Sequence, residues 1–244
     1  MSDELLIQKN KLIINQKHEA WSEVARKIAH EIKNPLTPIK LSIDRLKNKL
    51  SKGGAFDNDE FNSIIQTIDR QVDDIKGLVD EFSNFARMPT PRLEKNNIVD
   101  IIDSCILLFD QNHSNISFIK SIDSELSLIE CDKSQISRVI NNIFINSIYA
   151  INSLKDDTHK GIIMIDISST DSNLIVKISD NGVGIKHEEK ILLQPYFSTK
   201  DKNIGSGLGL SIVEKIISDH GGIFKIYNQK KITGVTCEFT LNIN

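Results

Sequence analysis

The sequence predicts an α+β protein in which an N-terminal two-helix hairpin forms a dimeric four-helix bundle and is followed by an α/β sandwich. Apolar residues recur at spacings of three and four over residues 5–50 and again over 61–85, which is typical of amphipathic helices. After residue 91 the pattern changes to short β-branched segments interleaved with helical ones, as in a sheet covered by helices on one face. A length of 244 residues leaves room for two small domains.

The first predicted helix covers Leu5 to Leu50 and carries one apolar stripe. We expect a bend at Pro35 and Pro38, because proline removes backbone donors there. The apolar positions before Trp21 continue the stripe like a coiled coil that starts upstream, so we expect a piece or a reduced version of a longer chain. The stripe consists of Trp21, Val24, Ala25, Ile28, Ile32, Leu36, Ile39, Ile43, Leu46 and Leu50.

The two helices of the hairpin are separated by Lys52-Gly53-Gly54, and the second ends at Met88-Pro89-Thr90-Pro91. Two helices alone have too little interior to bury both apolar stripes. We therefore expect the hairpin to pair with a second copy of itself. The alternative is a monomeric hairpin that packs on the second half of the chain.

A histidine stands on the polar side of the first helix. At about 100° per residue, His30 lies roughly 190° from the centre of the apolar stripe, so its side chain should face solvent. A lone histidine is more often a hydrogen-bonded core residue, but a core residue belongs on the stripe. An exposed imidazole can serve as a nucleophile or a proton carrier.

The second half of the chain contains six predicted strands and three predicted helices. The strands are Ile116–Ile122, Leu126–Glu130, Ile162–Ser168, Leu174–Ser179, Ile223–Asn228 and Val235–Leu241. The helices are Ile98–Phe109, Ser134–Leu154 and Leu208–Asp219.

Two glycine-rich segments adjoin these elements. Asp180-Asn181-Gly182-Val183-Gly184-Ile185 closes a strand, and Gly205-Ser206-Gly207-Leu208-Gly209-Leu210 opens a helix. Glycine lets the backbone approach a ligand closely, and free amides at a helix N-terminus attract phosphate. The segments do not fit the dinucleotide pattern GxGxxG, and GxxxxGK[ST] does not occur. Taken singly, each is explained equally well as a turn.

Asn142 and Asn146 lie four residues apart, on one face of a predicted helix. Two neutral amides there can ligate a hydrated magnesium ion whose other ligands are phosphates. The alternative is an asparagine-rich surface, since Asn141 and Asn152 are close by. Further along, Pro195–Lys200 predicts a mobile lid with a phosphate-seeking lysine, or else a flexible surface loop.

Composition excludes several partners and sites. A net charge of −3 with interspersed lysine and glutamate gives no strong field for nucleic acid or an anionic membrane, so we expect neither partner. The cysteines Cys105, Cys131 and Cys237 are widely separated without CxxC, which suits a reducing compartment and argues against a zinc site. The sequence has no run near the roughly 18 to 20 apolar residues that cross a bilayer, so we expect a soluble chain.

The order of these motifs resembles that of the sensor histidine kinases of two-component signalling. His30–Thr37 is similar to the H-box and Asn142–Asn146 to the N-box of that family. Asp180–Ile185 resembles its G1 box, Pro195–Lys200 its F-box and Gly205–Val213 its G2 box. The resemblance runs from about residue 18 to the end, and residues 29–39 and 82–89 are similar to the NtrY-type nitrogen-regulation kinases.

The resemblance implies three parts: a signalling-helix segment over residues 1–17, a dimerisation and histidine-phosphotransfer hairpin over 18–88, and a Bergerat-type ATP-binding domain over 92–244. Asp180 would accept the adenine amino group. Asn142 and Asn146 would hold Mg²⁺, with Asn146 as the direct ligand. The remaining nucleotide-binding positions would be Gly182, Gly184, Lys200, Gly205, Gly207 and Gly209, with Lys200 and the amides near Gly207 and Gly209 meeting the phosphates.

The same resemblance implies a reaction. Neutral His30 would attack the γ-phosphate of ATP, with Glu31 accepting or orienting the ring proton. The phosphoryl group would pass to an aspartate of a response regulator, which Asn34 could also help to dephosphorylate by orienting water. This part of the protein would lie in the cytoplasm, and longer relatives would be anchored in the inner membrane by upstream segments.

Two other functions remain open from the sequence. One is a conformational ATPase of the same fold, in which a glutamate on the asparagine helix activates water. Asn142 stands four residues before Asn146, where this glutamate would be, and an amide cannot act as a general base. The other is a non-catalytic dimeric scaffold whose nucleotide domain has decayed.

Overall fold

The computed structural model describes residues 26, 28–29, 31–53, 57–86, 89–111, 113, 115–122, 128–154, 159–195, 197–198, 207–230 and 232–243. The chain divides into two compact units, Met1–Met88 and Pro89–Asn244, which are described separately. Within these described ranges, the helices are too short or too polar to cross a membrane.

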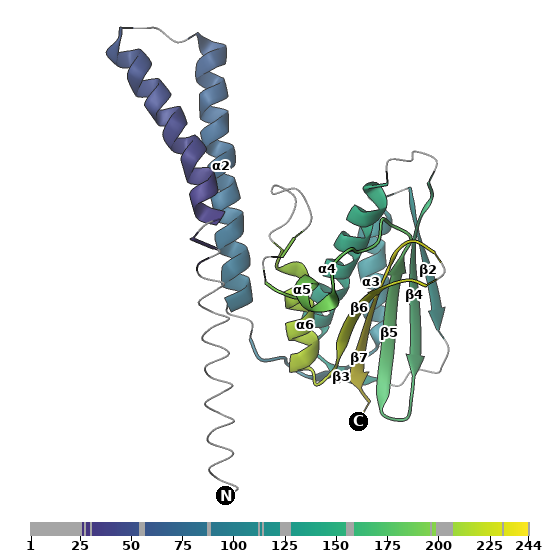
Figure 1. Cartoon of the computed structure of the whole chain (residues 1–244). Coiled ribbons are helices and arrows are strands. Elements are labelled where there is room, and N and C mark those ends of the chain that lie inside the picture. The colour runs from purple at the N-terminus through teal and green to yellow at the C-terminus, as the bar shows by residue number, and fades with distance from the viewer. Residues whose placement is uncertain are drawn as a thin grey trace, which may run out of the picture. The chain divides into compact units, whose positions relative to one another are not determined.

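The first unit is a helical hairpin (Figure 1). Its first helix is continuous over residues 31–51 and continues through Pro35 and Pro38, whereas the part of the predicted helix before residue 26 lies outside the described residues. The helix ends at Gly53, whose N–H donates to the Leu50 carbonyl at 3.0 Å and whose φ is 68°. Glycine adopts this left-handed conformation without strain, as is common at helix C-termini. The second helix, α2, spans Asn58–Ala86.

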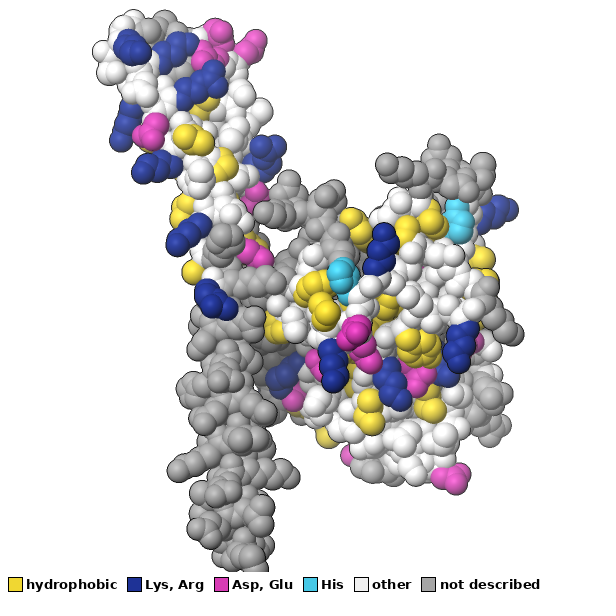
Figure 2. Space-filling model, in the orientation of Figure 1, with side chains coloured by type: hydrophobic (Ala, Val, Ile, Leu, Met, Phe, Trp, Pro, Cys, Tyr) yellow, Lys and Arg dark blue, Asp and Glu magenta, His cyan; other side chains and the backbone are white. Residues whose placement is uncertain are grey.

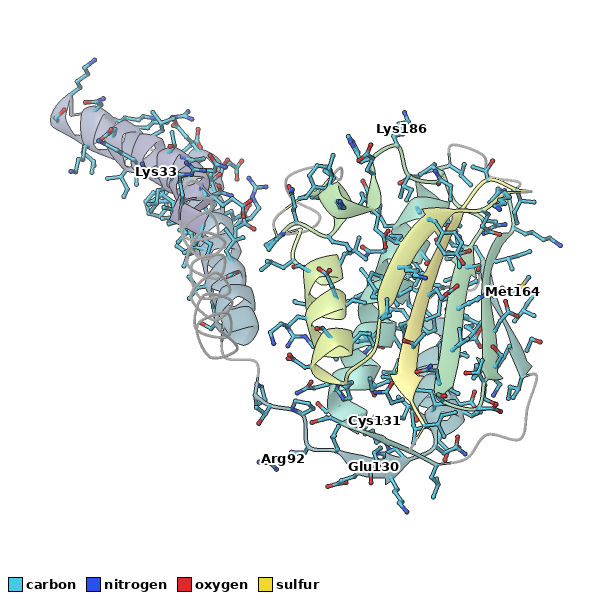
Figure 3. All side chains as sticks on the ribbon, turned by 60° about the horizontal axis from the view of Figure 1, so that its bottom comes forward. Lys33, Arg92, Glu130, Cys131, Met164 and Lys186 are labelled. Atoms are coloured by element: carbon cyan, nitrogen blue, oxygen red, sulfur yellow. The ribbon has the colours of Figure 1, made fainter. Side chains whose placement is uncertain are left out.

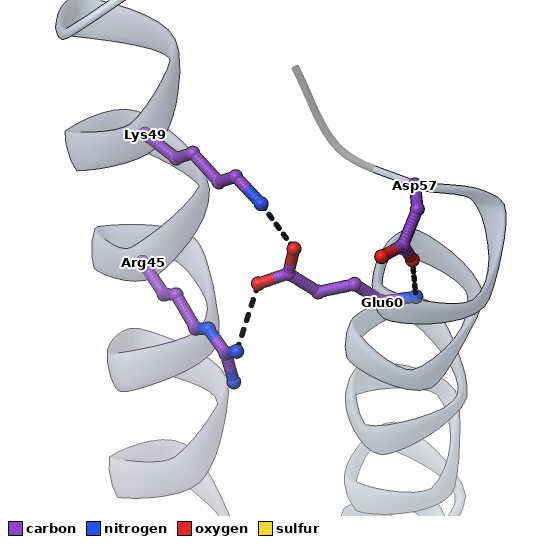
Figure 4. Close-up of polar contacts among 4 residues, drawn as sticks. All are labelled: Arg45, Lys49, Asp57 and Glu60. Carbon is purple, nitrogen blue, oxygen red and sulfur yellow. Dashed lines mark hydrogen bonds and ion pairs between the residues drawn. The ribbon is translucent and has the colours of Figure 1, made fainter. Parts of the chain in front are cut away.

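Polar contacts join the two helices near the turn of the hairpin (Figure 4). Asp57 Oδ1 accepts the backbone N–H of Glu60 at 2.6 Å and thereby caps α2. The Glu60 carboxylate reaches the first helix, where it pairs with Lys49 and, at 2.8 Å, with Arg45. Hydrogen bonds from Lys49 and then Arg45 lower the pKa of Glu60. These contacts fix the relative register of the helices at this end.

The hairpin buries only part of its apolar surface. Ile64 on α2 is buried, but Leu36, Ile43 and Leu50 of the first helix are exposed and recur every seven residues. Exposed apolar residues on α2 are Phe61, Val72 and Val79. A seven-residue apolar repeat is typical of a helix that packs against another helix.

The second unit contains a five-stranded sheet with the order β2-β4-β5-β7-β6 and helices on one face (Figure 1). β2 is parallel to β4, and the other pairs are antiparallel. The strands are β2 Ile116–Ile122, β4 Gly161–Ser169, β5 Asn173–Asp180, β6 Phe224–Asn228 and β7 Val235–Asn242. The helices are α3 Ile98–Asp110, α4 Lys133–Asn152, α5 Glu189–Leu192 and α6 Gly209–Asp219.

Alternating burial shows which face of the sheet is covered. Every second residue of β5 is buried, from Leu174 to Asp180, and these residues point to the same side as the buried isoleucines of β4. Met164 of β4 lies on the opposite, exposed face (Figure 3). The core therefore lies between the sheet and the helices.

On the face of the molecule drawn in Figure 2, basic and acidic side chains are interspersed rather than sorted by sign.

The segment after Pro89 is tied to the start of α4. Asp132 caps α4 by accepting the Gln135 N–H at 3.0 Å, and its other carboxylate oxygen accepts the Arg92 N–H at 3.0 Å. The Gln135 side chain donates to the Pro89 carbonyl at 3.0 Å. His220, at the end of α6, accepts the Asp132 N–H at 3.1 Å. One aspartate thus connects the incoming chain with two helices.

The predicted elements of the second unit are largely confirmed. Five strands agree with their predicted bounds to within one residue, and the three helices agree to within two. The predicted strand Leu126–Glu130 is found as β3, Ile129–Cys131, which pairs with β1, Glu94–Asn96, near the labelled Arg92 and Glu130 in Figure 3. β1 and α5, Glu189–Leu192, were not predicted, because three and four residues are too few to show a period.

Candidate functional site

A buried carboxylate marks one end of the candidate site. Asp180 is the last residue of β5 and is only 5% exposed. Its Oδ1 accepts the backbone N–H groups of Gly182 at 2.9 Å and Val235 at 3.3 Å, and its Oδ2 accepts the Ser147 hydroxyl at 3.1 Å. Burial raises the pKa of Asp180, and the three hydrogen bonds oppose that increase. The carboxylate is therefore held in one orientation.

The glycine loop that follows Asp180 is pressed against α4. A Cβ at Gly182 would come within 2.6 Å of the Ala150 carbonyl carbon, and the Val183 N–H donates to the Ala150 carbonyl at 3.2 Å. Gly184 has a φ of 76°, which favours glycine. The first glycine is required by close packing and the second by backbone conformation.

The turn between β6 and β7 also reaches Asp180. The Gln229 side chain donates to the main-chain carbonyl of Asp180 at 2.6 Å. Gly234 packs on the same carbonyl, since a Cβ there would lie 1.8 Å from the oxygen. Neither these two residues nor Ser147 were predicted from the sequence. Ser147 could have been found as a polar residue on the buried face of a helix, which needs a partner.

The two asparagines meet the second glycine segment. Asn142 and Asn146 lie one turn apart on α4, both partly exposed. A Cβ at Gly209, the first residue of α6, would lie 3.2 Å from Asn142 Oδ1 and 3.9 Å from Asn146 Nδ2. The Asn142 amide nitrogen donates to the Arg138 carbonyl at 2.9 Å, so its oxygen is the atom beside Gly209. The N-terminus of the eleven-residue helix α6 therefore lies beside the side-chain amides of Asn142 and Asn146.

The remaining candidate residues are only partly described. His30, Lys200 and Gly205 lie outside the described residues. On the first helix of the hairpin, Glu31 is partly exposed and Asn34 is exposed.

Within the second unit, α4 collects most of the candidate groups. Ser147 and Ala150 contact Asp180 and its loop, whereas Asn142 and Asn146 contact the start of α6. The candidate groups are therefore arranged along α4, with the acceptor carboxylate of Asp180 beside Ser147 and the side-chain amides of Asn142 and Asn146 nearer the start of α6. Such an arrangement can bind a ligand with a hydrogen-bond donor at one end and an anionic group at the other.

Two family models match the chain. Residues 20–91 match the His Kinase A (phospho-acceptor) domain, and residues 131–244 match the histidine kinase-, DNA gyrase B-, and HSP90-like ATPase. The first match covers the hairpin, and the second covers most of the sheet domain with α4 and both glycine segments.

The chain is similar to curated kinases. It is 38% identical to the nitrogen regulation protein NtrY of Azorhizobium caulinodans over 94% of its length and 30% of that protein. It is 35% identical to a putative NtrY-like sensor histidine kinase of Rickettsia prowazekii, over 94% of its length and 37% of the relative. The chain therefore spans about a third of the length of these relatives.

Solved structures show the same folds. The catalytic domain of histidine kinase ThkA matches with a TM-score of 0.53 and 30% identity, over 62% of this chain and 97% of that one. ThkA in complex with the response regulator protein TrrA matches with a TM-score of 0.67 and 26% identity, over 91% of this chain and 61% of that one. With its phospho-acceptor hairpin followed by an ATPase-type domain, the chain belongs to the sensor histidine kinases and resembles those of the NtrY type.

Proposed function

We propose that the chain is an ATP-dependent protein histidine kinase that phosphorylates His30 and passes the phosphoryl group to an aspartate of a response regulator. The observation that carries the proposal is the arrangement along α4. Asp180 lies at one end, and Asn142 and Gly209 lie together at the other. A nucleotide offers an amino group and phosphates in a matching order.

The nucleotide's base would bind at Asp180. The Asp180 carboxylate accepts hydrogen bonds, so it can receive the adenine amino group. Gly182 and Gly184 would form the wall of this part of the site. The tight packing of Gly182 against α4 supports this role, because it holds the loop beside the carboxylate.

The phosphates would bind near the start of α6. The N–H groups in the first turn of α6, which starts at Gly209, carry the positive end of the helix dipole, which attracts phosphate. Gly207 has a φ of 72° and precedes this helix. Lys200 and Gly205, which lie outside the described residues, complete the proposed phosphate site.

Asn146 and Asn142 would hold Mg²⁺. The residues fit the ion, because Asn142 directs an amide oxygen toward Gly209 and magnesium prefers oxygen ligands. When bound, Mg²⁺ would neutralise charge on the phosphate oxygens.

The chemical step would take place on the hairpin. A neutral imidazole nitrogen of His30 attacks the γ-phosphorus, a P–N bond forms, and the P–O bond to ADP breaks. Glu31 accepts or orients the ring proton, which keeps the attacking nitrogen unprotonated. A carboxylate oxygen of the regulator's aspartate then displaces the imidazole from phosphorus.

The active form would be a homodimer. Leu36, Ile43 and Leu50 form an exposed apolar row with a seven-residue repeat, and α2 has exposed apolar residues of its own. A second hairpin can cover both, giving a four-helix bundle.

We further propose the division into residues 1–17, 18–88 and 92–244 and a cytoplasmic location for this part of the protein. The buried, unpaired thiols of Cys105, Cys131 and Cys237 support a reducing compartment.

Incubation of the full chain with γ-³²P-ATP and Mg²⁺ tests the proposal. We expect an acid-labile, alkali-stable label on the protein that disappears in His30→Gln and persists in His187→Gln, a control at an exposed histidine of the second unit. The label should then pass to a purified receiver domain. Release of free phosphate without labelled protein would indicate the conformational ATPase instead.

A further inference from the structure

Ser147 is a polar residue in the apolar interior of the second unit. It is 3% exposed and lies on the face of α4 that also carries the buried Ile143 and Ile151. A buried hydroxyl without a partner is costly, and the Ser147 hydroxyl donates to Asp180 Oδ2 at 3.1 Å. The Asp180 carboxylate is thus the hydrogen-bond acceptor that satisfies this buried hydroxyl.

The hydrogen bonds of Asp180 leave little freedom for a ligand. A carboxylate has about two acceptor positions on each oxygen. Oδ1 uses both for Gly182 and Val235, whereas Oδ2 uses one for Ser147. A ligand donor therefore has to approach Oδ2 beside the Ser147 hydroxyl.

We infer that Ser147 is a positioning residue that sets the base preference of this site. By donating to Oδ2, it keeps Asp180 an ionised acceptor directed at a purine with a 6-amino group. A 6-oxo purine would place a second acceptor against the carboxylate, so the 6-oxo group would lack a donor and be repelled by Oδ2. The inference rests on the proposed nucleotide site and adds the residue that controls discrimination there.

The surroundings of Asp180 make the effect dependent on pH. Burial raises the pKa of Asp180, and the hydroxyl of Ser147 is one of three donors that oppose the increase. The titratable group facing it from β7 is the Cys237 thiol, whose pKa burial and then the Asp180 charge raise. Gln229, which contacts Asp180 from the turn after β6, is neutral. Without the hydroxyl, the carboxyl protonates more readily and can donate to a 6-oxo group.

Calorimetric titration of the full chain with ADP and IDP in Mg²⁺ tests this inference, because the two nucleotides differ only at the Watson–Crick edge of the purine, where the 6-amino group becomes 6-oxo and N1 gains a proton. We expect the parent protein to prefer ADP by roughly 100-fold, and Ser147→Ala to reduce that preference roughly tenfold. The reduction should be larger at pH 6 than at pH 8. Ser147→Thr keeps the hydroxyl and should retain most of the preference.

Ser179→Ala is the matched control. Ser179 also loses only a hydroxyl and directly precedes Asp180, but it bonds Thr236 at 2.9 Å on the other face of the sheet. The Ser179→Ala variant should prefer ADP over IDP by the same factor as the parent protein.

The outcomes separate the inference from the proposed function. If Ser147→Ala changes the affinities for ADP and IDP by the same factor, so that the preference is unchanged, Ser147 has only a structural role and the inference is wrong. Binding of ADP would in that case still support the nucleotide site. Absence of ADP binding by the parent protein would instead refute the proposed function.

Discussion

Gly182 packs directly on the backbone of Ala150: a Cβ at Gly182 would lie 2.6 Å from the Ala150 carbonyl carbon and 2.8 Å from the Ile151 nitrogen. Both neighbours belong to α4, so the loop and the helix form one rigid wall beside Asp180. Backbone atoms inside a helix cannot move aside as a flexible side chain can.

Gly182→Ala should therefore destabilise the protein by about 1–3 kcal/mol and weaken ADP binding. Urea unfolding and calorimetry measure the two effects. Gly77→Ala on α2 is the control, because among the described residues no atom lies within 4 Å of a Cβ placed there, and it should stabilise the helix by about 0.5–1 kcal/mol. Equal effects of the two substitutions would show that the close contact is unimportant.

Asp180→Asn should separate stability from recognition. Burial raises the pKa of Asp180, so its ionisation costs the folded state stability as pH rises from the ordinary value of 3.8 through the folded pKa. The free energy of unfolding of Asp180→Asn relative to the parent should rise over this window and then level off. ADP affinity should fall about 10- to 100-fold, because the amide presents a donor where the site has an acceptor. Unfolding curves from pH 4 to 8 that run parallel would contradict this account.

Ile43→Glu should dissociate the proposed dimer. The charge would enter the apolar row of Leu36, Ile43 and Leu50 in both copies, raising the dissociation constant by roughly 100-fold. Sedimentation equilibrium measures the change. Leu41→Glu is the control, since Leu41 is 64% exposed and lies roughly 160° away around the same helix. If both variants remain dimeric, the row is not the interface.

Asn34→Ala should slow dephosphorylation of a regulator by roughly 100-fold while leaving autophosphorylation largely intact, because only the former would need the amide to orient water. Assays with labelled receiver domain and with γ-³²P-ATP measure the two rates separately. Asn48→Ala, at another exposed position of the same helix, should change neither. Equal loss of both activities would refute the assigned role.

Asp132→Ala should cost about 1–2 kcal/mol of stability at pH 7, because the cap of α4 and the bond to Arg92 are lost. Burial alone would raise the pKa of Asp132, but the N–H groups of Arg92, Gln135 and Ser134 together lower it. Its contribution is therefore present above the ordinary pKa of 3.8 and is lost as pH falls through the folded value. The difference in the free energy of unfolding between Asp132→Ala and the parent, measured in urea, should therefore disappear in acid. Asp171→Ala, at an exposed position, should change the free energy of unfolding little at pH 7 or in acid.

Much of the geometry of the candidate site was predictable because it follows local rules. The spacing of four places Asn142 and Asn146 on one face of α4, and the two glycine segments fall where a strand ends and a helix begins. The sequence also predicted that two helices alone cannot bury both apolar stripes, and the hairpin leaves Leu36, Ile43 and Leu50 exposed. His30 lies outside the described residues, so the expected exposure of its side chain remains a prediction.

Local periodicity is enough to assign residues to one face of a helix or a strand, because a helix repeats every 3.6 residues and a strand every two. The same periodicity does not predict that Val235, Gln229 and Gly234 surround Asp180. Those contacts exist because β7 lies between β5 and β6 in the sheet, an order that depends on the packing of the whole domain. Residues about fifty positions apart share no local period, so the way in which the Asp180 carboxylate is held follows from the packing of the strands and cannot be read from the sequence pattern.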